Sequence, residues 1–260
     1  MADNSVELAR RIALAKEQYN QYAATARHNF VEPVAHISFE AGDDVTKVHI
    51  DVAGESTQYH LESMQPTDAA TVYAYLNKHP IVREKYADGK TPSEEATTRR
   101  ITQLAERYKT GEEPSPLHLY SGFMVTDTET GTFLGMCNIG GGTQPGHAEM
   151  ARLNRPDAWQ HVPADVVERY DIPTDKRITG KSYAELGTIE SSTLFQYTTA
   201  LKAKGCKVNG VEVIALDATN RIDNPGAWKS NAKAGFEVVD VTERPEYGPE
   251  LRFEVRRSIR

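Results

Sequence analysis

The sequence predicts a mixed α/β protein with one mostly antiparallel sheet of six or seven strands flanked by helices. Alternating apolar runs typical of strands recur from about residue 59 to residue 255. Segments with apolar residues at three- and four-residue spacing, typical of helices, separate several of these runs. The expected order is strand, two helices, three strands, helix, strand, helix and two strands, which fits helices packed on a mixed sheet.

The first 55 residues are expected to form an extension of this domain. A helix is predicted over Ser5–His28, where apolar residues recur along one stripe. Two alternating runs then flank the turn-forming sequence Ala41-Gly42-Asp43-Asp44, which predicts a β-hairpin. We therefore divide the chain into a helix and hairpin extension (1–55) and a main domain (56–260).

The main domain is expected to open with a strand and two helices. Residues 59–64 alternate as a strand, and Pro66-Thr67-Asp68 is expected to cap the helix that follows. The sequence Thr91-Pro92-Ser93-Glu94 predicts the start of the second helix, with the threonine as N-cap and the glutamate completing a capping box.

The same criteria assign the rest of the domain. The expected elements are strands 120–125, 132–139 and 147–153, a long connection 154–176 with a short helix at 164–170, helix 182–204, strand 211–216, helix 224–234, and strands 236–241 and 251–255. The polar stretch Asp217-Ala218-Thr219-Asn220 is expected to be a turn.

Composition limits the possible partners. The 260 residues carry a formal net charge of −7 and no basic block, which argues against nucleic-acid binding and mildly favours a cationic substrate. The two cysteines, Cys137 and Cys206, lack a Cys-x-x-Cys spacing, so neither a metal site nor a disulfide is expected. No signal peptide and no apolar run of membrane-spanning length is found, and a cytoplasmic location is expected.

The segment Arg177-Ile178-Thr179-Gly180-Lys181-Ser182 is a candidate anion site because it precedes the predicted long helix. Free N–H groups at a helix N-terminus bind anions, Gly180 allows close approach of the backbone, and Arg177 and Lys181 add positive charge. Such loops are common in proteins, so an ordinary structural loop remains the alternative.

A second candidate segment runs from Asn224 to Phe236. Asn224 is expected to cap a helix, with Pro225 at its first position and Gly235 at its end. These roles are structural, and by themselves they indicate no ligand.

Taken together, the two segments resemble the acetyl-CoA-binding core of the GNAT superfamily. Arg177-x-x-Gly180-x-Ser182 is similar to that family's Gln/Arg-x-x-Gly-x-Gly/Ala pyrophosphate loop. Residues 224–236 resemble its Asn-x-x-Ala/Ser and Lys-x-Gly-Phe signature. Upstream, residues 61–69 and 127–135 follow the layout of the RimJ/RimL-like branch, so the resemblance covers about residues 56–260.

The resemblance implies direct acetyl transfer from acetyl-CoA to an amine. The sheet would be splayed between the strand around 149–153 and the strand at 213–216, so that the pantetheine arm lies between them. The backbone of the first strand would pair with that arm, and the loop would hold the pyrophosphate. The cofactor-binding residues implied in this way are Arg152, Leu153, Arg177, Thr179, Gly180, Lys181, Ser182, Tyr183, Asn224 and Ala227.

Glu149 resembles the acidic residue that some relatives use as a general base. The alternatives are a salt-bridged strand residue at this position, or His147, which lies two residues earlier on the same face, as the base. Many relatives have a tyrosine acid where this chain has Asn231, so Ser230, Tyr183 or water would have to protonate the thiolate.

The long connection 154–176 is expected to act as a lid over the acceptor, with Trp159, His161 and Tyr170 as contacts, or to cover a sheet edge. The acceptor amine would be a protein N-terminus, a lysine or a small amine. A non-catalytic acyl-CoA-binding or interaction module on the same fold is the alternative function. A homodimer is compatible with either.

Overall fold

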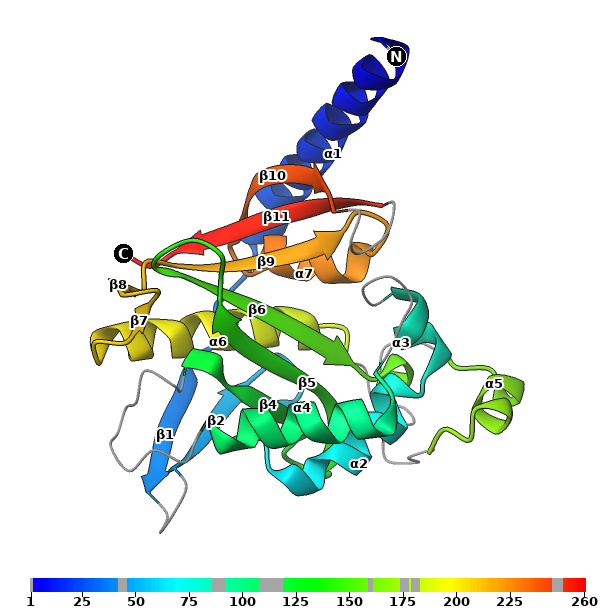
Figure 1. Ribbon diagram of the computed structural model, residues 1–260, viewed down its shortest axis with the longest axis vertical. Coiled ribbons are helices and arrows are strands. Elements are labelled where there is room, and N and C mark those ends of the chain that lie inside the picture. Colours follow the sequence, from blue (N-terminus) through cyan, green and yellow to red (C-terminus); the bar gives the residue numbers. More distant parts are fainter. Residues whose placement is uncertain are drawn as a thin grey trace.

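A computed structural model describes residues 2–41, 46–85, 92–107, 119–158, 161–173, 178, 183–244 and 250–260. Within these residues one sheet of nine strands forms the centre of the molecule, in the order β1-β2-β3-β4-β5-β6-β9-β11-β10. Helices lie on both of its faces (Figure 1).

The strands of this sheet and of a small separate hairpin have the following bounds. They are β1 Ala35–Ala41, β2 Thr46–Ala53, β3 Gln58–Ser63, β4 Gly122–Asp127, β5 Thr132–Gly141, β6 His147–Asn154, β9 Ala215–Arg221, β10 Glu237–Glu243 and β11 Leu251–Ser258, with β7 Lys207–Val208 and β8 Val211–Glu212 forming the hairpin.

The helices are of very different lengths. The α-helices are α1 Ala2–His28, α2 Ala69–Val72, α3 Pro80–Lys85, α4 Glu94–Glu106, α5 Ala164–Arg169, α6 Leu186–Ala203 and α7 Pro225–Lys233. Single turns of 3-10 helix lie at Pro66–Asp68 and Pro156–Ala158, and a π-helical turn lies at Tyr73–Asn77. Among the described residues, no helix is long and apolar enough to cross a membrane.

The sheet confirms the expected mixed architecture and extends it. The main domain contributes seven strands, and the N-terminal hairpin adds two more because β2 pairs antiparallel with β3. Every neighbouring pair in the sheet is antiparallel except β6 and β9, which run parallel. The hairpin of the extension is therefore continuous with the main sheet.

Helix α1 is held to the main domain by its C-terminal half. Ala15, Tyr19 and Ala23 are buried, and the Tyr19 hydroxyl donates to the backbone carbonyl of Phe236 at 2.9 Å. The N-terminal half projects away from the body of the molecule (Figure 1) and exposes apolar side chains such as Leu14.

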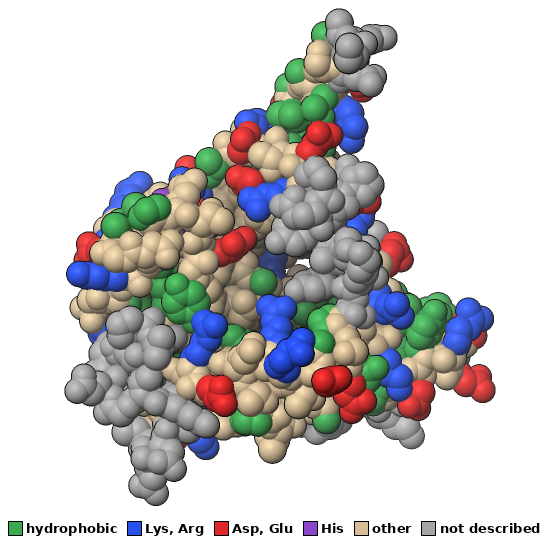
Figure 2. All heavy atoms as spheres, viewed as in Figure 1, with side chains coloured by type: hydrophobic (Ala, Val, Ile, Leu, Met, Phe, Trp, Pro, Cys, Tyr) green, Lys and Arg blue, Asp and Glu red, His purple; other side chains and the backbone are tan. Residues whose placement is uncertain are grey.

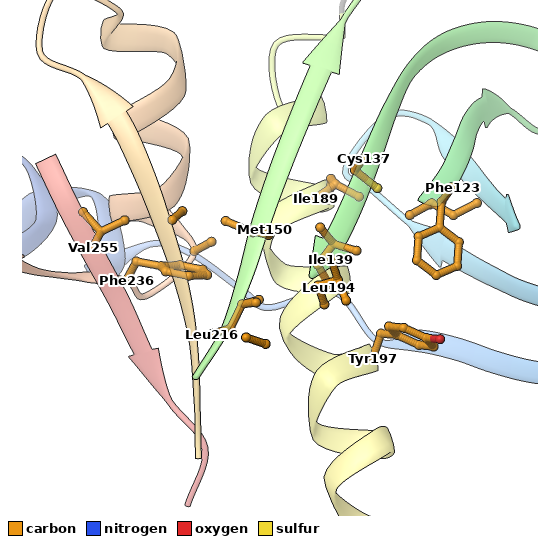
Figure 3. Packing of buried hydrophobic residues seen from close by; sticks show 14 of the residues in the cluster. Phe123, Cys137, Ile139, Met150, Ile189, Leu194, Tyr197, Leu216, Phe236 and Val255 are labelled. Atoms are coloured by element: carbon orange, nitrogen blue, oxygen red, sulfur yellow. The ribbon is translucent and has the colours of Figure 1, made fainter. Parts of the chain in front are cut away.

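The main core lies between the sheet and helices α6 and α7. Figure 3 shows Met150 and Leu216, from neighbouring strands, together with Ile189 and Leu194 from α6 and Phe236 after α7. A smaller apolar cluster lies where α2 and α4 meet the sheet, and it contains Met64, Ala69, Val72, Leu76, Ile101, Phe133 and Met136. The two clusters together account for the alternation that predicted the strands.

Two of the expected elements differ from the structure in the region that matters for the site. The predicted strand 211–216 is divided into β8 and the start of β9, and the predicted turn 217–220 lies inside β9. The polar residues there still alternate: Ala218 and Asn220 are buried, while Asp217 and Thr219 point to the other, more open face. The sequence was interpreted as a turn because its polarity hid this alternation.

Helix starts also differ from expectation. Helix α4 is capped by Ser93, whose hydroxyl accepts from the Ala96 amide at 3.2 Å, whereas the expected cap, Thr91, lies outside the described residues. Helix α6 begins at Leu186 and not at Ser182. Its N-cap residue, Glu185, accepts hydrogen bonds from the Glu55 amide at 2.9 Å and the Tyr59 hydroxyl at 3.2 Å.

Candidate active site

The parallel strands β6 and β9 separate part-way along their length. They pair only at His147–Glu149 with Ala215–Asp217. Beyond that point β6 continues along β5 and β9 continues along β11, without pairing with each other. Figure 3 shows the two strands close together at their N-terminal ends and then diverging. The backbone edges that face each other beyond Glu149 are therefore free to pair with an inserted ligand.

Glu149 lies at the vertex where the two strands part. Its side chain is half-buried, and its carboxylate accepts a hydrogen bond from the Thr219 hydroxyl at 3.4 Å. Burial raises the pKa of the Glu149 carboxyl, and the nearby Arg244 guanidinium opposes the shift. No ion pair involves Glu149 among the described residues. A half-buried carboxyl with a raised pKa has the properties expected of a general base.

His147, the other candidate base, is held more tightly. Its Nδ1 lies 3.1 Å from the Asp217 carboxylate, and its side chain is almost fully buried. Asp217 also accepts two hydrogen bonds from Arg256, at 2.8 and 3.0 Å. These contacts leave His147 less free than Glu149 to reach a substrate, so the geometry favours Glu149.

The opposite face of β6 carries Arg152, which connects three elements. Its guanidinium donates to the backbone carbonyl of Gly187, to the Ser191 hydroxyl at 2.7 Å, and to the backbone carbonyl of Ala227 at 2.7 Å. The side chain thus spans from β6 to α6 and α7. Sequence reasoning assigned Arg152 a backbone contact with the cofactor and did not anticipate this bridge.

Asn231 extends the polar network begun by Arg152. It is 1% exposed, its Oδ1 lies 2.7 Å from the Ser191 hydroxyl, and its amide donates to Asn220 Oδ1 at 3.2 Å. The residue that replaces the expected tyrosine therefore links α6, α7 and β9. An amide at this position cannot act as a general acid.

Glu190 is a second carboxyl that the sequence analysis did not identify. It is fully buried on α6 and accepts a hydrogen bond from the Asn154 amide at 2.8 Å. Burial raises the pKa of Glu190 to about 7, and the charge of Arg152 opposes that shift. The available signal in the sequence was that Glu190 is the single acidic residue of α6, whose other residues are almost all uncharged.

Comparison with known proteins identifies this arrangement. The structure is similar to an acetyltransferase of the GNAT family from Bacillus anthracis, at 12% identity and a TM-score of 0.52, over 85% of this chain and 98% of that one. It is also similar to the ribosomal-protein-S5-alanine acetyltransferase from Vibrio fischeri, at 14% identity and a TM-score of 0.53, over 80% and 96% of the two chains. The chain has the GNAT acetyltransferase fold.

A third structure with the GNAT fold includes the cofactor. It is the microcin C7 self-immunity acetyltransferase in complex with acetyl-CoA and AMP, similar at 10% identity and a TM-score of 0.50, over 79% of this chain and 94% of that one. No family model matches the sequence, and the comparison with curated proteins finds no relative. The relationship is thus visible in the fold and not in overall sequence identity.

The expected pyrophosphate loop of the GNAT fold is only partly described. Arg177, Thr179, Gly180, Lys181 and Ser182 lie outside the described residues, as does Trp159 of the expected lid. Tyr183 follows the loop, and its buried hydroxyl donates to Asp127 at 2.8 Å. This bond holds the Tyr183 side chain against the end of β4.

Helix α7 begins on the far side of the gap between β6 and β9, opposite Arg152. Asn224 caps the helix, and its Oδ1 accepts from the Ala227 amide at 3.4 Å. The Ala227 carbonyl accepts from Arg152, so both predicted residues lie beside the gap. Leu153, by contrast, points to the other face of β6, where it packs against the smaller apolar cluster.

The N-terminal extension reaches the N-terminal end of α6. A hollow of about 170 Å³ at the N-terminal end of α6 is lined by Phe30 and Pro33 of the extension, Gly54 after β2, Glu185 and Lys233.

The remaining expected lid residues, His161 and Tyr170, flank α5, which lies at the periphery (Figure 1).

Proposed function

We propose that this protein is an acetyl-CoA-dependent N-acetyltransferase that transfers an acetyl group to a primary amine, with Glu149 as the general base. The divergence of β6 and β9 directly after Glu149 is the observation that carries the proposal. It places two unpaired strand edges beside a half-buried carboxyl that has no ion-pair partner among the described residues.

The residues around the strand gap fit the pantetheine arm in part. Backbone groups of Arg152 lie on the free edge of β6, whereas those of Leu153 face β5, and Asn224 and Ala227 lie opposite Arg152. An arm inserted between β6 and α7 has to displace the Arg152 guanidinium from the Ala227 carbonyl or pass beside it. Sequence resemblance supports the loop from Arg177 to Ser182 as the pyrophosphate site.

The chemistry divides between cofactor and protein. Acetyl-CoA, when bound, supplies an acetyl group activated as a thioester. Glu149 accepts the proton that the attacking amine loses, directly or through water. Asp217 and Glu254 lie close to Glu149, but each is paired with an arginine, Arg256 and Arg244 respectively, so their charges are largely offset.

The acceptor class is proposed from two sources. The similarity to a ribosomal-protein-S5-alanine acetyltransferase supports an amino group of a protein, and the formal net charge of −7 suits a small cationic amine equally well. On the face shown in Figure 2, basic and acidic side chains are interspersed over the described surface, which does not favour a polyanionic partner. The exposed apolar side chains of the projecting half of α1 support a proposed homodimer.

A non-catalytic acyl-CoA-binding module is the second candidate. Two observations favour it: Asn231 replaces the tyrosine acid of many relatives, and the Arg152 side chain bridges β6 and α7, beside which the arm would have to pass. Thiol release in the presence of acetyl-CoA and a panel of amines and peptides distinguishes the two functions. Release with at least one acceptor supports the enzyme, whereas acetyl-CoA binding without release from any of them supports the module.

The loop assignment has its own test. Gly180→Glu should abolish acetyl-CoA binding, because it places a bulky negative side chain at the proposed diphosphate site. Gly131→Glu is a suitable control, since Gly131 lies in the β4–β5 turn with nothing within 4 Å of an added Cβ. The control has a positive φ of 63°, so both variants are compared by circular dichroism before titration. Unchanged affinity in a folded Gly180→Glu variant would contradict the assignment.

A further inference from the structure

We propose that His49, His60 and Glu62 form a binding site for a divalent transition-metal ion such as Zn²⁺. The three residues lie on β2 and β3, on the face of these strands opposite to α6. One ligand atom from each residue lies within 4.8 Å of the ligand atoms of the other two. The proposal is independent of acetyl transfer, because β4 and β5 separate β3 from β6 and Glu149.

The register of the strands brings the three side chains together. His49 is directly opposite Glu62, and His60 is opposite Asp51, which is two residues along from His49 on the same face. The two imidazole rings are 5.5 Å apart, centre to centre, and inclined by 30°. The site therefore rests on sheet pairing and not on a loop.

The separations suit a metal after a small adjustment. Tetrahedral zinc with ligand bonds of about 2.0–2.2 Å requires ligand atoms roughly 3.3–3.5 Å apart. The observed upper limit of 4.8 Å leaves at most about 1.5 Å to close, which side-chain rotation can supply. The His49 and His60 side chains are 23% and 27% exposed, so an ion can reach them from solvent.

A second observation supports the site: each imidazole already has a carboxylate on one nitrogen. His60 Nδ1 lies 2.7 Å from Asp51 Oδ1, and His49 Nε2 lies 3.2 Å from Glu40 Oε2. This leaves Nε2 of His60 and Nδ1 of His49 for a metal. Carboxylate partners on the second nitrogen are characteristic of histidine ligands, because they fix the ring and increase its basicity.

The donor set also indicates which ions bind. Two imidazoles and one carboxylate suit Zn²⁺, Ni²⁺ or Cu²⁺, whereas Mg²⁺ and Ca²⁺ prefer oxygen ligands alone. Three protein ligands leave one position for water, as in open zinc sites. Cys137 and Cys206 are buried and do not compete for the ion.

Isothermal titration of the tag-free, full-length protein with ZnCl₂ tests the proposal. We expect one site in the wild type, binding weakened at least about tenfold in His49→Ala and in His60→Ala, and no heat with MgCl₂. His28→Ala and His161→Ala remove exposed imidazoles far from β2 and β3 and should bind Zn²⁺ like the wild type. Asp51→Asn should weaken binding by about tenfold while keeping both imidazoles.

Nuclear magnetic resonance of the imidazole nitrogens provides a readout that does not depend on the variants. Saturation with Zn²⁺ should shift Nε2 of His60 and Nδ1 of His49 selectively. Absence of a binding heat in the wild type, equal affinity in folded His49→Ala and His60→Ala, or nitrogen shifts confined to other histidines would each overturn the proposal. The last two results would also show that any bound zinc is held elsewhere.

Discussion

The charged groups on the two faces of β6 lie in different environments. On one face Glu149 is half-buried at the strand vertex, with a hydroxyl as its hydrogen-bond partner. On the other, Arg152 and the fully buried Glu190 lie in a polar network between β6, α6 and α7. Burial raises the pKa of both carboxyls, but only Glu149 is placed where a substrate could meet it. A raised pKa therefore does not distinguish a reactive carboxyl from a structural one without this geometry.

The largest expected effect concerns the face of β6 that carries Glu149. Glu149→Gln should lower kcat by about two to four orders of magnitude, because it removes the proton acceptor and keeps the shape. In the wild type, kcat/KM should rise with pH as Glu149 loses its proton, and that limb should be missing in the variant. Steady-state kinetics across pH check this, with Glu243→Gln, an exposed carboxyl on β10, as the control. Wild-type turnover in Glu149→Gln would show that Glu149 is not the base.

The next largest effect concerns the face of β6 that carries Arg152. Arg152→Met should destabilise the fold by about 3–5 kcal/mol, because it leaves the buried Glu190 without the nearby cation and removes three hydrogen bonds. Urea unfolding measures the loss. The double variant Arg152→Met/Glu190→Gln should recover part of it, since the uncompensated acid is then removed. Strictly additive losses in the double variant would contradict the coupling of these two residues.

Glu190 makes a smaller contribution that depends on pH. A glutamate ionises near 4.3 in an unfolded chain, whereas the pKa of Glu190 is about 7 in the fold. The folded state thus holds the proton more tightly, so this stabilisation is present at low pH and is lost as pH rises through 7.

Glu190→Gln should remove this pH dependence. Relative to the wild type, its free energy of unfolding should increase between pH 4.5 and pH 8 by an amount on the order of 3 kcal/mol. Urea titrations at several pH values provide the measurement. A constant difference between the two proteins over this range would show that the pKa of Glu190 is not raised.

The smallest expected effect comes from the hydroxyl beside Arg152. Ser191→Ala removes one acceptor for the guanidinium and the partner of Asn231 Oδ1, so we expect a loss of about 1–2 kcal/mol. Urea unfolding again gives the value. Ser192→Ala is not a neutral comparison, because Ser192 binds Glu32 at 2.7 Å; Thr199→Ala, outside the network, serves better. Equal effects of Ser191→Ala and Thr199→Ala would indicate that the network adds nothing beyond a single local bond.

Much of the fold followed from local patterns in the sequence. Asn224 and Pro225 predicted the start of α7 because capping depends on adjacent residues alone. Periodicity failed in β9, where Asp217 and Thr219 are polar because they face Arg256 and Glu149 rather than a turn. Their strand character depends on partners that are distant along the chain.

The residues of the site, too, could be predicted only in part from the sequence. Glu149 was identified from its place on a strand and from resemblance, and the structure puts it at the vertex. The bridge made by Arg152 and the link made by Asn231 each join three elements, which no local pattern encodes. The His49 and His60 pair was missed for the same reason: cysteine spacing was examined, whereas these histidines meet only through strand register.

Titration of the wild-type protein with acetyl-CoA by calorimetry tests the central claim most directly. If the diverging strands β6 and β9 accept the pantetheine arm, the protein should bind one molecule of acetyl-CoA per chain, and free CoA should compete with it. The absence of binding by a folded protein would contradict both the enzyme and the acyl-CoA-binding module, and would leave the opening beside Glu149 without the proposed ligand.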